Sequence, residues 1–410
     1  MGFQQGLSGL NAASKSLDVI GNNVANANTV GFKESQAQFA DVYANSLTGA
    51  GASQVGIGVK VAQVTQQFTQ GNVTASNNPL DVAINGGGFF RMSNNGTVTY
   101  GRNGQFQLDK AGYIVNATAS RLTGYGVSAS GVLASGAPTD LNINTSDITP
   151  KTTTKVNAVL NLNSGSTVPT TTPFNMGDPT TYNNSTAVSV YDSLGNAHTL
   201  QTFYVKTAPN TWKVYAANDG VPIGYIPPAA PVAVGTMNFA SDGSLIPAAP
   251  FAVPVTVGTG ATSPFTVNVD FTGTSQYGSS FSVNALKQDG YTSGRLSGFS
   301  ISADGTIVGR YTNGQSATLG QVVLANFTNP NGLQSLGNNL WTETATSGPA
   351  LVGTPNSGSL GVLQSSAVED SNVDLTAALV NMITAQRTYQ ANAQTIKTQD
   401  QVLQTLVNLR

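Results

Sequence analysis

The side chains that could carry out chemistry in this sequence are few. His198 is the only histidine and cysteine is absent, so a histidine metal cluster and a cysteine nucleophile are both excluded within one chain. Serine–histidine–aspartate catalysis would depend on His198, and no Gly-X-Ser-X-Gly sequence surrounds any serine. We therefore expect no catalytic, metal or cofactor-binding residues and no enzyme activity. The aspartates are scattered, without the spacing of a carboxylate pair or a calcium loop; examples are Asp41, Asp81, Asp109 and Asp192.

The triple glycine at residues 86–88 is the one segment that suggests a phosphate-binding loop. The lysine followed by serine or threonine that such a loop needs is absent, and Phe89 and Phe90 follow instead. We predict a turn that enters a strand. Short alternating segments also surround two other conspicuous residues, and we predict His198 on a strand surface and Trp212 packed within a strand.

Charged residues are sparse. Asp, Glu, Lys and Arg make up 9% of the 410 residues, against about 25% in typical globular proteins. The 17 basic and 19 acidic residues leave a net charge of −2, and no basic cluster indicates binding to nucleic acid or an anionic membrane. A net charge near zero favours association between copies. No segment approaches the roughly 20 apolar residues of a membrane helix, and the first residues lack the positive leader of a cleaved signal peptide.

Both ends of the chain have the periodicity of an amphipathic helix. Apolar residues recur at steps of three and four from Phe3 to Ala27, without a proline. A four–three alternation from Leu375 to Val407 predicts a second helix, with Asn372 or Asp374 as its N-cap. These are the only two long helices that the sequence predicts. The positions expected at subunit interfaces are Phe3, Leu7, Leu10, Leu17, Ile20, Val24, Leu375, Leu379, Met382, Tyr389, Ile396, Leu403 and Val407.

The apolar stripes of these helices must be buried against something. One arrangement packs both helices on the chain's own β-structure, where they cap its core. In the other, the helices pair with each other, and neighbouring copies cover the apolar surface that remains, so that the ends order on assembly. The length of the C-terminal stripe favours the second arrangement. A head-to-tail contact that does not close on itself produces a helical filament.

The residues between the helices predict β-structure. They are rich in Val, Thr, Gly, Asn and Ser, and Asn-Gly and Asp-Gly dipeptides recur at positions suited to tight hairpin turns. One such hairpin is predicted around residues 192–196, and residues 47–59 resemble a flexible linker or an extended arm. We predict an α+β chain whose terminal helices form a coiled-coil-like inner domain, with two mainly antiparallel β-domains inserted between them. Its parts are 1–30 with 371–410 (helical), 31–77 with 362–370 (extended connector), 78–147 with 290–361 (inner β-domain) and 148–289 (outer β-domain).

The segment DVIGNNVANANTVGFK, residues 18–33, resembles the N-terminal signature of bacterial flagellar rod and hook proteins. The segment from residue 371 to the end resembles their C-terminal region, and residues 80–90, 101–109 and 319–333 resemble the inner β-domain of the hook members. The asparagine-rich stretch also reads as a helix end, with Phe32 as a buried anchor. The signature residues are Asn22, Asn23, Asn26, Asn28, Thr29, Gly31 and Phe32.

Phe39 and Tyr43 resemble a short aromatic export-recognition motif of rod and hook subunits. The same spacing also suits two aromatic residues on one face of a short helix. We expect the helix as the local structure, and the two interpretations can hold at different stages of export and assembly.

The resemblance implies a subunit of the flagellar hook, a curved helical tube that bends as a universal joint while it transmits torque from motor and rod to filament. It implies that the terminal helices form the inner wall around a central export channel. The implied partners are further copies, the distal rod, the hook cap, the hook–filament junction proteins and the flagellar type III export apparatus. The implied location is the hook, outside the cell, without a cleaved signal. The alternatives are a distal rod or junction subunit, which the large middle region opposes, and an extracellular β-rich adhesin.

Overall fold

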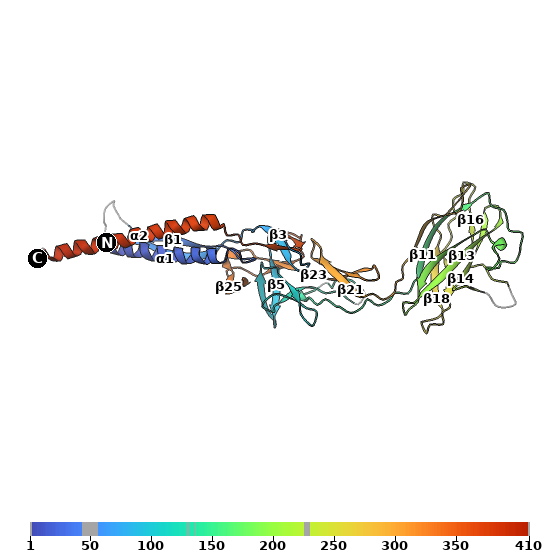
Figure 1. Cartoon of the computed structure of the whole chain (residues 1–410), viewed down its shortest axis with the longest axis horizontal. Coiled ribbons are helices and arrows are strands. Elements are labelled where there is room, and N and C mark those ends of the chain that lie inside the picture. Colours follow the sequence, from blue (N-terminus) through green and yellow to red (C-terminus); the bar gives the residue numbers. More distant parts are fainter. Residues whose placement is uncertain (1, 43–55, 129–130, 135, 225–229, 409–410) are drawn as a thin grey trace. The chain divides into compact units, whose positions relative to one another are not determined.

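The computed structural model describes residues 2–42, 56–128, 131–134, 136–224 and 230–408 (Figure 1). The chain forms two compact units. The first contains residues 1–145, 298–310 and 316–410, and the second contains residues 146–297 and 311–315. Terminal helices and many antiparallel strands make the chain an α+β protein, as predicted.

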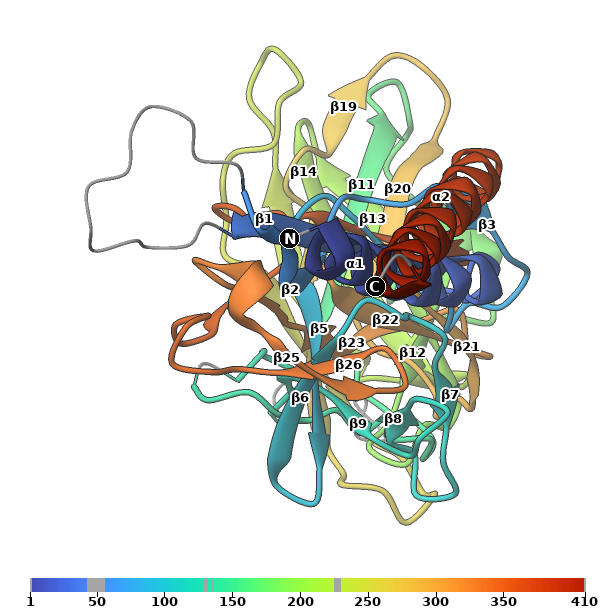
Figure 2. The ribbon, with the colours of Figure 1, turned by 90° about the vertical axis from the view of Figure 1, so that its left-hand side faces the viewer.

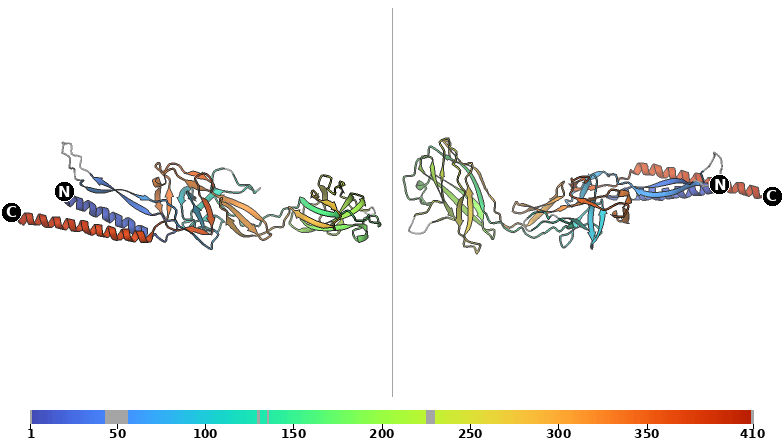
Figure 3. Two further views of the ribbon diagram at one scale, coloured as in Figure 1. Left: turned by 90° about the horizontal axis from the view of Figure 1, so that it is seen from above. Right: turned by 180° about the vertical axis from the view of Figure 1, so that it is seen from behind.

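Two long helices stand at the chain ends. Helix α1 spans Gly2–Ala25 and helix α2 spans Leu375–Asn408, and they lie side by side in all views (Figure 3). Asp374 is the N-cap of α2, because its Oδ1 accepts the N–H of Ala377 at 3.0 Å. Asn372, the other predicted cap, instead accepts the N–H of Glu34 through its Oδ1 at 2.7 Å. No helix among the described residues is long and apolar enough to cross a membrane.

A two-stranded hairpin packs against α1 (Figure 2). Its strands are β1, Ser35–Val42, and β2, Gly58–Gln66. Phe39 lies within β1, so the expected short helix carrying Phe39 and Tyr43 is wrong for Phe39. The pairing of Phe39 with Val61 across the hairpin explains why a strand forms there. Tyr43 and most of the predicted linker, 47–55, lie outside the described residues.

Besides the β1–β2 hairpin, the described residues of the first unit form one large sheet and two small ones. In the large sheet, the hydrogen-bonded neighbours lie in the order β21-β22-β23-β9-β5-β6-β26-β25. In each small sheet, a strand that shortly precedes α2 pairs with a strand from the N-terminal part of the chain: β28 pairs with β4, and β29 pairs with β3. The strands are β3 Val73–Ala75, β4 Val82–Asn85, β5 Phe89–Asn94, β6 Thr97–Gly101, β7 Gln107–Leu108, β8 Ile114–Val115, β9 Arg121–Tyr125, β10 Thr139–Asp140, β21 Leu296–Ile301, β22 Thr306–Tyr311, β23 Ser316–Val322, β24 Leu324–Asn326, β25 Gln334–Gly337, β26 Leu340–Thr342, β27 Leu351–Gly353, β28 Val362–Ser365 and β29 Ala367–Glu369.

An aromatic cluster fills part of this unit. Phe89 meets Trp341 edge to face, with ring centroids 5.9 Å apart, and Tyr100 meets Phe327 in the same way at 4.8 Å. The indole N–H of Trp341 donates to Oε1 of Gln66 at 2.6 Å and so attaches the end of β2 to the sheet. The glycines at 86–88 form the predicted turn into β5, and two of them have positive φ.

The described part of the second unit contains two sheets that share a large apolar core, and a smaller buried cluster forms around Phe174 and Phe203. The predicted hairpin is confirmed, because Asp192 and Asn196 close the turn between β12 and β13. Trp212 is confirmed as a packed strand residue, fully buried on β14 with its indole N–H donating to Gln276. The strands are β11 Lys155–Asn163, β17 Phe251–Val255, β18 Phe265–Asp270, β19 Ser275–Tyr277 and β20 Ser282–Gln288 in one sheet, and β12 Asn184–Tyr191, β13 Ala197–Ala208, β14 Thr211–Asn218, β15 Val221–Pro222 and β16 Gly235–Asn238 in the other. Two short 3-10 helices complete the described elements, Pro179–Thr181 here and Pro330–Gly332 in the first unit.

Candidate functional site

Small residues allow α1 and α2 to approach closely as an antiparallel pair. A Cβ atom added to Gly6 would lie 3.1 Å from Cγ1 of Ile396, and one added to Gly9 would lie 2.8 Å from Oδ1 of Asn392. Ala13 is buried on the same face of α1. On α1 the closest contact within one chain is therefore at glycine and alanine, and Ile396 is the residue of the predicted α2 stripe that packs against it.

Most of the large apolar residues on the helices remain uncovered. Leu403 and Val407 are 56% and 74% exposed, and Phe3, Leu7, Leu375, Leu379 and Tyr389 are also exposed. The other predicted interface positions, Leu10, Leu17, Ile20, Val24, Met382 and Ile396, are half-buried. Sequence reasoning missed three further exposed apolar residues, because they fall outside the four–three alternation: Val380, Ile383 and Val402.

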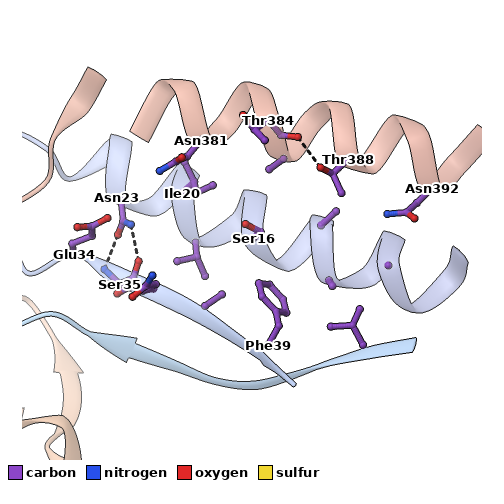
Figure 4. A pocket seen from close by; sticks show the side chains of 18 residues that line it. Ser16, Ile20, Asn23, Glu34, Ser35, Phe39, Asn381, Thr384, Thr388 and Asn392 are labelled. Carbon is purple, nitrogen blue, oxygen red and sulfur yellow. Dashed lines mark hydrogen bonds between the residues drawn. The ribbon is translucent and has the colours of Figure 1, made fainter. Parts of the chain in front are cut away.

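A groove of about 560 Å³ runs along α1 between α2 and the β1–β2 hairpin (Figure 4). Its floor is the small-residue face of α1, from Gly9 through Ala13 to Ser16. Phe39 contributes to the hairpin wall. The α2 wall is polar, formed by Asn381, Thr384, Thr388 and Asn392. The groove therefore has a floor of small residues, a polar wall on α2 and an aromatic ring on the hairpin side.

The signature residues hold the end of α1 against the hairpin. Asn23 is buried, and its side-chain amide exchanges two hydrogen bonds with the backbone of Ser35, at 2.8 and 2.9 Å. Gly31 has a φ of +71° and donates its N–H to the carbonyl of Glu369 at 2.8 Å. Phe32 is buried, as predicted. The remaining members, Asn22, Asn26, Asn28 and Thr29, form or border the turn after Ala25, so the helix-end interpretation is confirmed.

Three buried charges join distant parts of the first unit. Nζ of Lys33 lies 2.7 Å from Oε1 of Glu369, and Nε of Arg102 lies 3.0 Å from Oε2 of the same carboxylate. Burial lowers the pKa of both Lys33 and Arg102, and the charge of Glu369 opposes that shift. Backbone carbonyls of Thr69, Gly86 and Gly88 accept the remaining hydrogen bonds of the two cations. Sequence reasoning did not find this charge cluster, although Lys33 ends the signature segment.

His198 is not on a strand surface, which corrects the prediction. It lies on β13 but is only 7% exposed, with Nδ1 2.6 Å from Oδ2 of Asp219 and Nε2 3.3 Å from Oδ2 of Asp192. Burial lowers the pKa of His198, but hydrogen bonds to the two carboxylates outweigh burial and raise it overall. Burial likewise raises the pKa of Asp192, and hydrogen bonds from Asn196 and Thr259 more than reverse that shift. Among the described residues, no cluster of acidic, histidine or cysteine side chains could hold a metal ion.

The stability of the second unit should depend on pH through His198. Because its folded pKa is raised, its contribution is fully present below the unfolded pKa, about 6.5, and is lost as the pH rises through the folded pKa. Asp219 has a lowered pKa, so its contribution is lost only in acid. The opening free energy of β13 and β14 amides in the full chain, obtained from hydrogen exchange after division by the base-catalysed intrinsic rate, should therefore fall above neutral pH. His198→Gln should remove this dependence, and equal pH dependence in both chains would contradict it.

Four family models match successive segments of the sequence. "Flagella basal body rod protein" matches residues 3–33, and "Flagellar hook protein FlgE/F/G D1 domain" matches residues 83–159. "Flagellar basal body protein FlaE D2 domain" matches residues 161–291, and "Flagellar basal body rod FlgEFG protein C-terminal" matches residues 364–409.

Curated relatives match the chain from end to end. The flagellar hook protein FlgE of Escherichia coli K12 is 45% identical over 414 residues, and that of Salmonella typhimurium LT2 is 47% identical over 416 residues. Both alignments cover 100% of this chain and of the relative. The crystal structure of Helicobacter pylori flagellar hook protein FlgE2 superposes with a TM-score of 0.54 at 15% identity, over 72% of this chain and all of that chain. At this identity the structural match supports a shared fold.

Proposed function

Because this chain belongs to the flagellar hook protein family and is a structural subunit of the hook, we propose that it polymerises there through α1 and α2. The observation that carries the proposal is the exposed apolar surface of the helix pair, which includes Leu375, Leu379, Leu403 and Val407. Large exposed apolar residues gathered on one element mark an interaction site. Further copies of the chain would bury them, in a coiled-coil-like inner wall.

The assembled product is a curved helical tube with a central export channel. It acts as a universal joint between the rod and the filament. In it, residues 1–30 and 371–410 form the inner wall, 31–77 and 362–370 the connector, 78–147 and 290–361 an inner β-layer, and 148–289 an outer β-layer. The compact unit of residues 146–297 supports the last of these boundaries. Sparse charge, 9% of residues, supports outer domains that slide past one another without breaking strong ion pairs.

The remaining partners follow from membership of the hook family. The distal rod would contact the first copies, a hook cap would cover the growing tip, and junction proteins would follow the last copies. The flagellar type III apparatus would export the chain to the hook outside the cell, where Phe39 and Tyr43 form the candidate recognition motif. The relatives are structural hook proteins, and we assign the chain no catalytic role.

Leu379→Asp should abolish polymerisation while leaving the single chain folded. Leu379 is exposed in the single chain, so the substitution should change its stability by less than about 0.5 kcal/mol. In the polymer it would bury a charge without a partner. Electron microscopy of hooks and a motility assay measure the outcome. Val221→Asp is the matched control, since Val221 is 64% exposed on the second unit. Normal hooks from Leu379→Asp chains would count against the proposed interface.

A further inference from the structure

We propose that the last two turns of α2 from one copy dock into the groove between α1, α2 and the hairpin of a second copy. This inference rests on the proposed polymerisation and names the surfaces that carry it. The donor is residues 401–408, here called the overhang. The acceptor is the groove whose floor runs from Gly9 to Ser16.

The overhang exists because α2 is longer than the helix that covers it. Gly6 lies against Ile396 and Gly9 against Asn392, and continuing this antiparallel pairing places Gly2, where α1 begins, opposite Asp400. Residues 401–408 therefore extend beyond α1 by about 12 Å, at the end of α2 marked C in Figure 1.

The overhang carries apolar side chains with no cover from its own chain. Val402, Leu403 and Val407 are all more than half exposed. Leu403 continues the heptad positions of Met382, Tyr389 and Ile396; Met382 and Ile396 are half-buried in the single chain, and Tyr389 is exposed. The stripe that α1 partly shields earlier in α2 thus runs on without a partner, and another α1 surface can complement it.

The groove offers such a surface. Its floor on α1 includes the small residues Gly9, Ala12, Ala13 and Ser16. Asn392 of the same chain already packs against Gly9, and Ala13 is buried, so the accessible part of the floor is at Ala12 and Ser16. Its lining extends from Gly9 to Asn23, about 21 Å along the helix axis, which exceeds the length of the overhang. Val59 and Phe39 add apolar contacts on the hairpin side.

The occupant must come from a second copy. Ser16 and Ala385 line the groove from opposite helices, and Leu403 lies 18 residues farther along the continuous α2, about 27 Å away. The donor and acceptor surfaces differ, so each copy that gives its overhang still offers an empty groove. A head-to-tail contact of this kind generates a filament when its rotation does not close.

A cysteine cross-link tests the contact, because the natural chain contains no cysteine. We place Leu403, near the middle of the overhang, against Ser16, in the middle of the lining from Gly9 to Asn23. Ser16→Cys combined with Leu403→Cys should then, on oxidation of isolated hooks, yield a ladder of covalent multimers on a denaturing gel. A disulfide requires Cα atoms within roughly 7 Å, so the ladder would report direct apposition. The matched control combines Ser16→Cys with Ala391→Cys, since Ala391 is exposed on α2 and absent from the groove lining. The control should remain monomeric.

A second pair of variants covers the case in which the cysteine chain does not assemble. Ser16→Leu fills the groove floor and should block hook formation, and adding Leu403→Ala to the same chain should restore it. Three results would each overturn the proposed docking. The first is curved hooks from the Ser16→Cys, Leu403→Cys chain that give no ladder. The others are a ladder from the Ala391 control and normal hooks from Ser16→Leu alone. These results would leave polymerisation through the helices standing, because Leu379→Asp tests that separately.

Discussion

Glu369→Gln is expected to lower the unfolding free energy of the first unit by about 3–5 kcal/mol, the usual cost of removing one partner from a buried ion pair. The substitution preserves the volume of the side chain but leaves Lys33 and Arg102 buried without a counter-charge. Denaturant unfolding followed by tryptophan fluorescence measures the change. A Trp212→Phe background confines the signal to Trp341, which is buried in the first unit.

Glu343→Gln is the matched control for Glu369→Gln. Glu343 is an exposed carboxylate in the same unit that accepts hydrogen bonds from Tyr100 and from the backbone of Ala350. Its replacement should cost about 1 kcal/mol or less. Adding Lys33→Met to Glu369→Gln should recover part of the loss, because one unpaired cation is removed. Equal losses for Glu369→Gln and Glu343→Gln would show that the buried cluster contributes nothing specific.

Gly104→Ala is expected to destabilise the same unit by about 3 kcal/mol or more, at or above the upper end of the usual range for overpacking. An added Cβ would overlap the carbonyl oxygen of Val82 and lie 3.0 Å from Cε2 of Phe90. Val82 begins β4 and donates its N–H to the carbonyl of Gly104 at 2.9 Å, so the backbone cannot retreat without losing that bond. The same fluorescence unfolding experiment measures the effect.

Gly126→Ala provides the opposite expectation. Nothing lies within 4 Å of a Cβ added there, so the substitution should be neutral or stabilise by up to about 1 kcal/mol, through the reduced entropy of the unfolded chain. The Gly104→Ala and Gly126→Ala chains should thus differ in stability by about 3 kcal/mol or more. A Gly104→Ala chain as stable as the natural chain would mean that β4 and the segment after Arg102 can separate without cost.

Local signals could be predicted from the sequence, and long-range ones could not. The two terminal helices and the turn at Asp192 depend on residues that are neighbours in sequence, and both predictions are confirmed. Lys33 and Glu369 are 336 residues apart. Nothing in the local pattern around either residue identifies its partner, so the buried cluster required the fold.

Two errors show where pattern reasoning was ambiguous. Aromatic residues four apart suit a helix face as well as a strand, and the pairing of β1 with β2 decided the conformation of Phe39. Alternation placed His198 on a strand, but the partners of its ring come from elsewhere in the fold: Asp219 follows β14, and Asp192 also accepts a hydrogen bond from Thr259.

The prediction of the contact between α1 and α2 was incomplete for a different reason. Periodicity analysis weighs large apolar residues, whereas the closest contact between α1 and α2 uses Gly6 and Gly9, which carry no apolar side chain. The large residues were correctly placed on the helices, yet many of them face away from the partner helix of the same chain. Their role at interfaces between copies stays a prediction until the substitutions above are made.

The two ends of the segment that forms most of the second unit lie next to each other, which affects how such chains can diverge. The chain enters and leaves it as an antiparallel pair, in which the N–H of Ile148 donates to Gly294 and Lys151 exchanges two hydrogen bonds with Tyr291. A segment whose two ends are adjacent can grow, shrink or be replaced while the parent domain keeps its own backbone spacing. We expect this position to act as an exchangeable cassette among lineages. A foreign domain with adjacent termini, grafted between residues 148 and 294, would be displayed in many ordered copies.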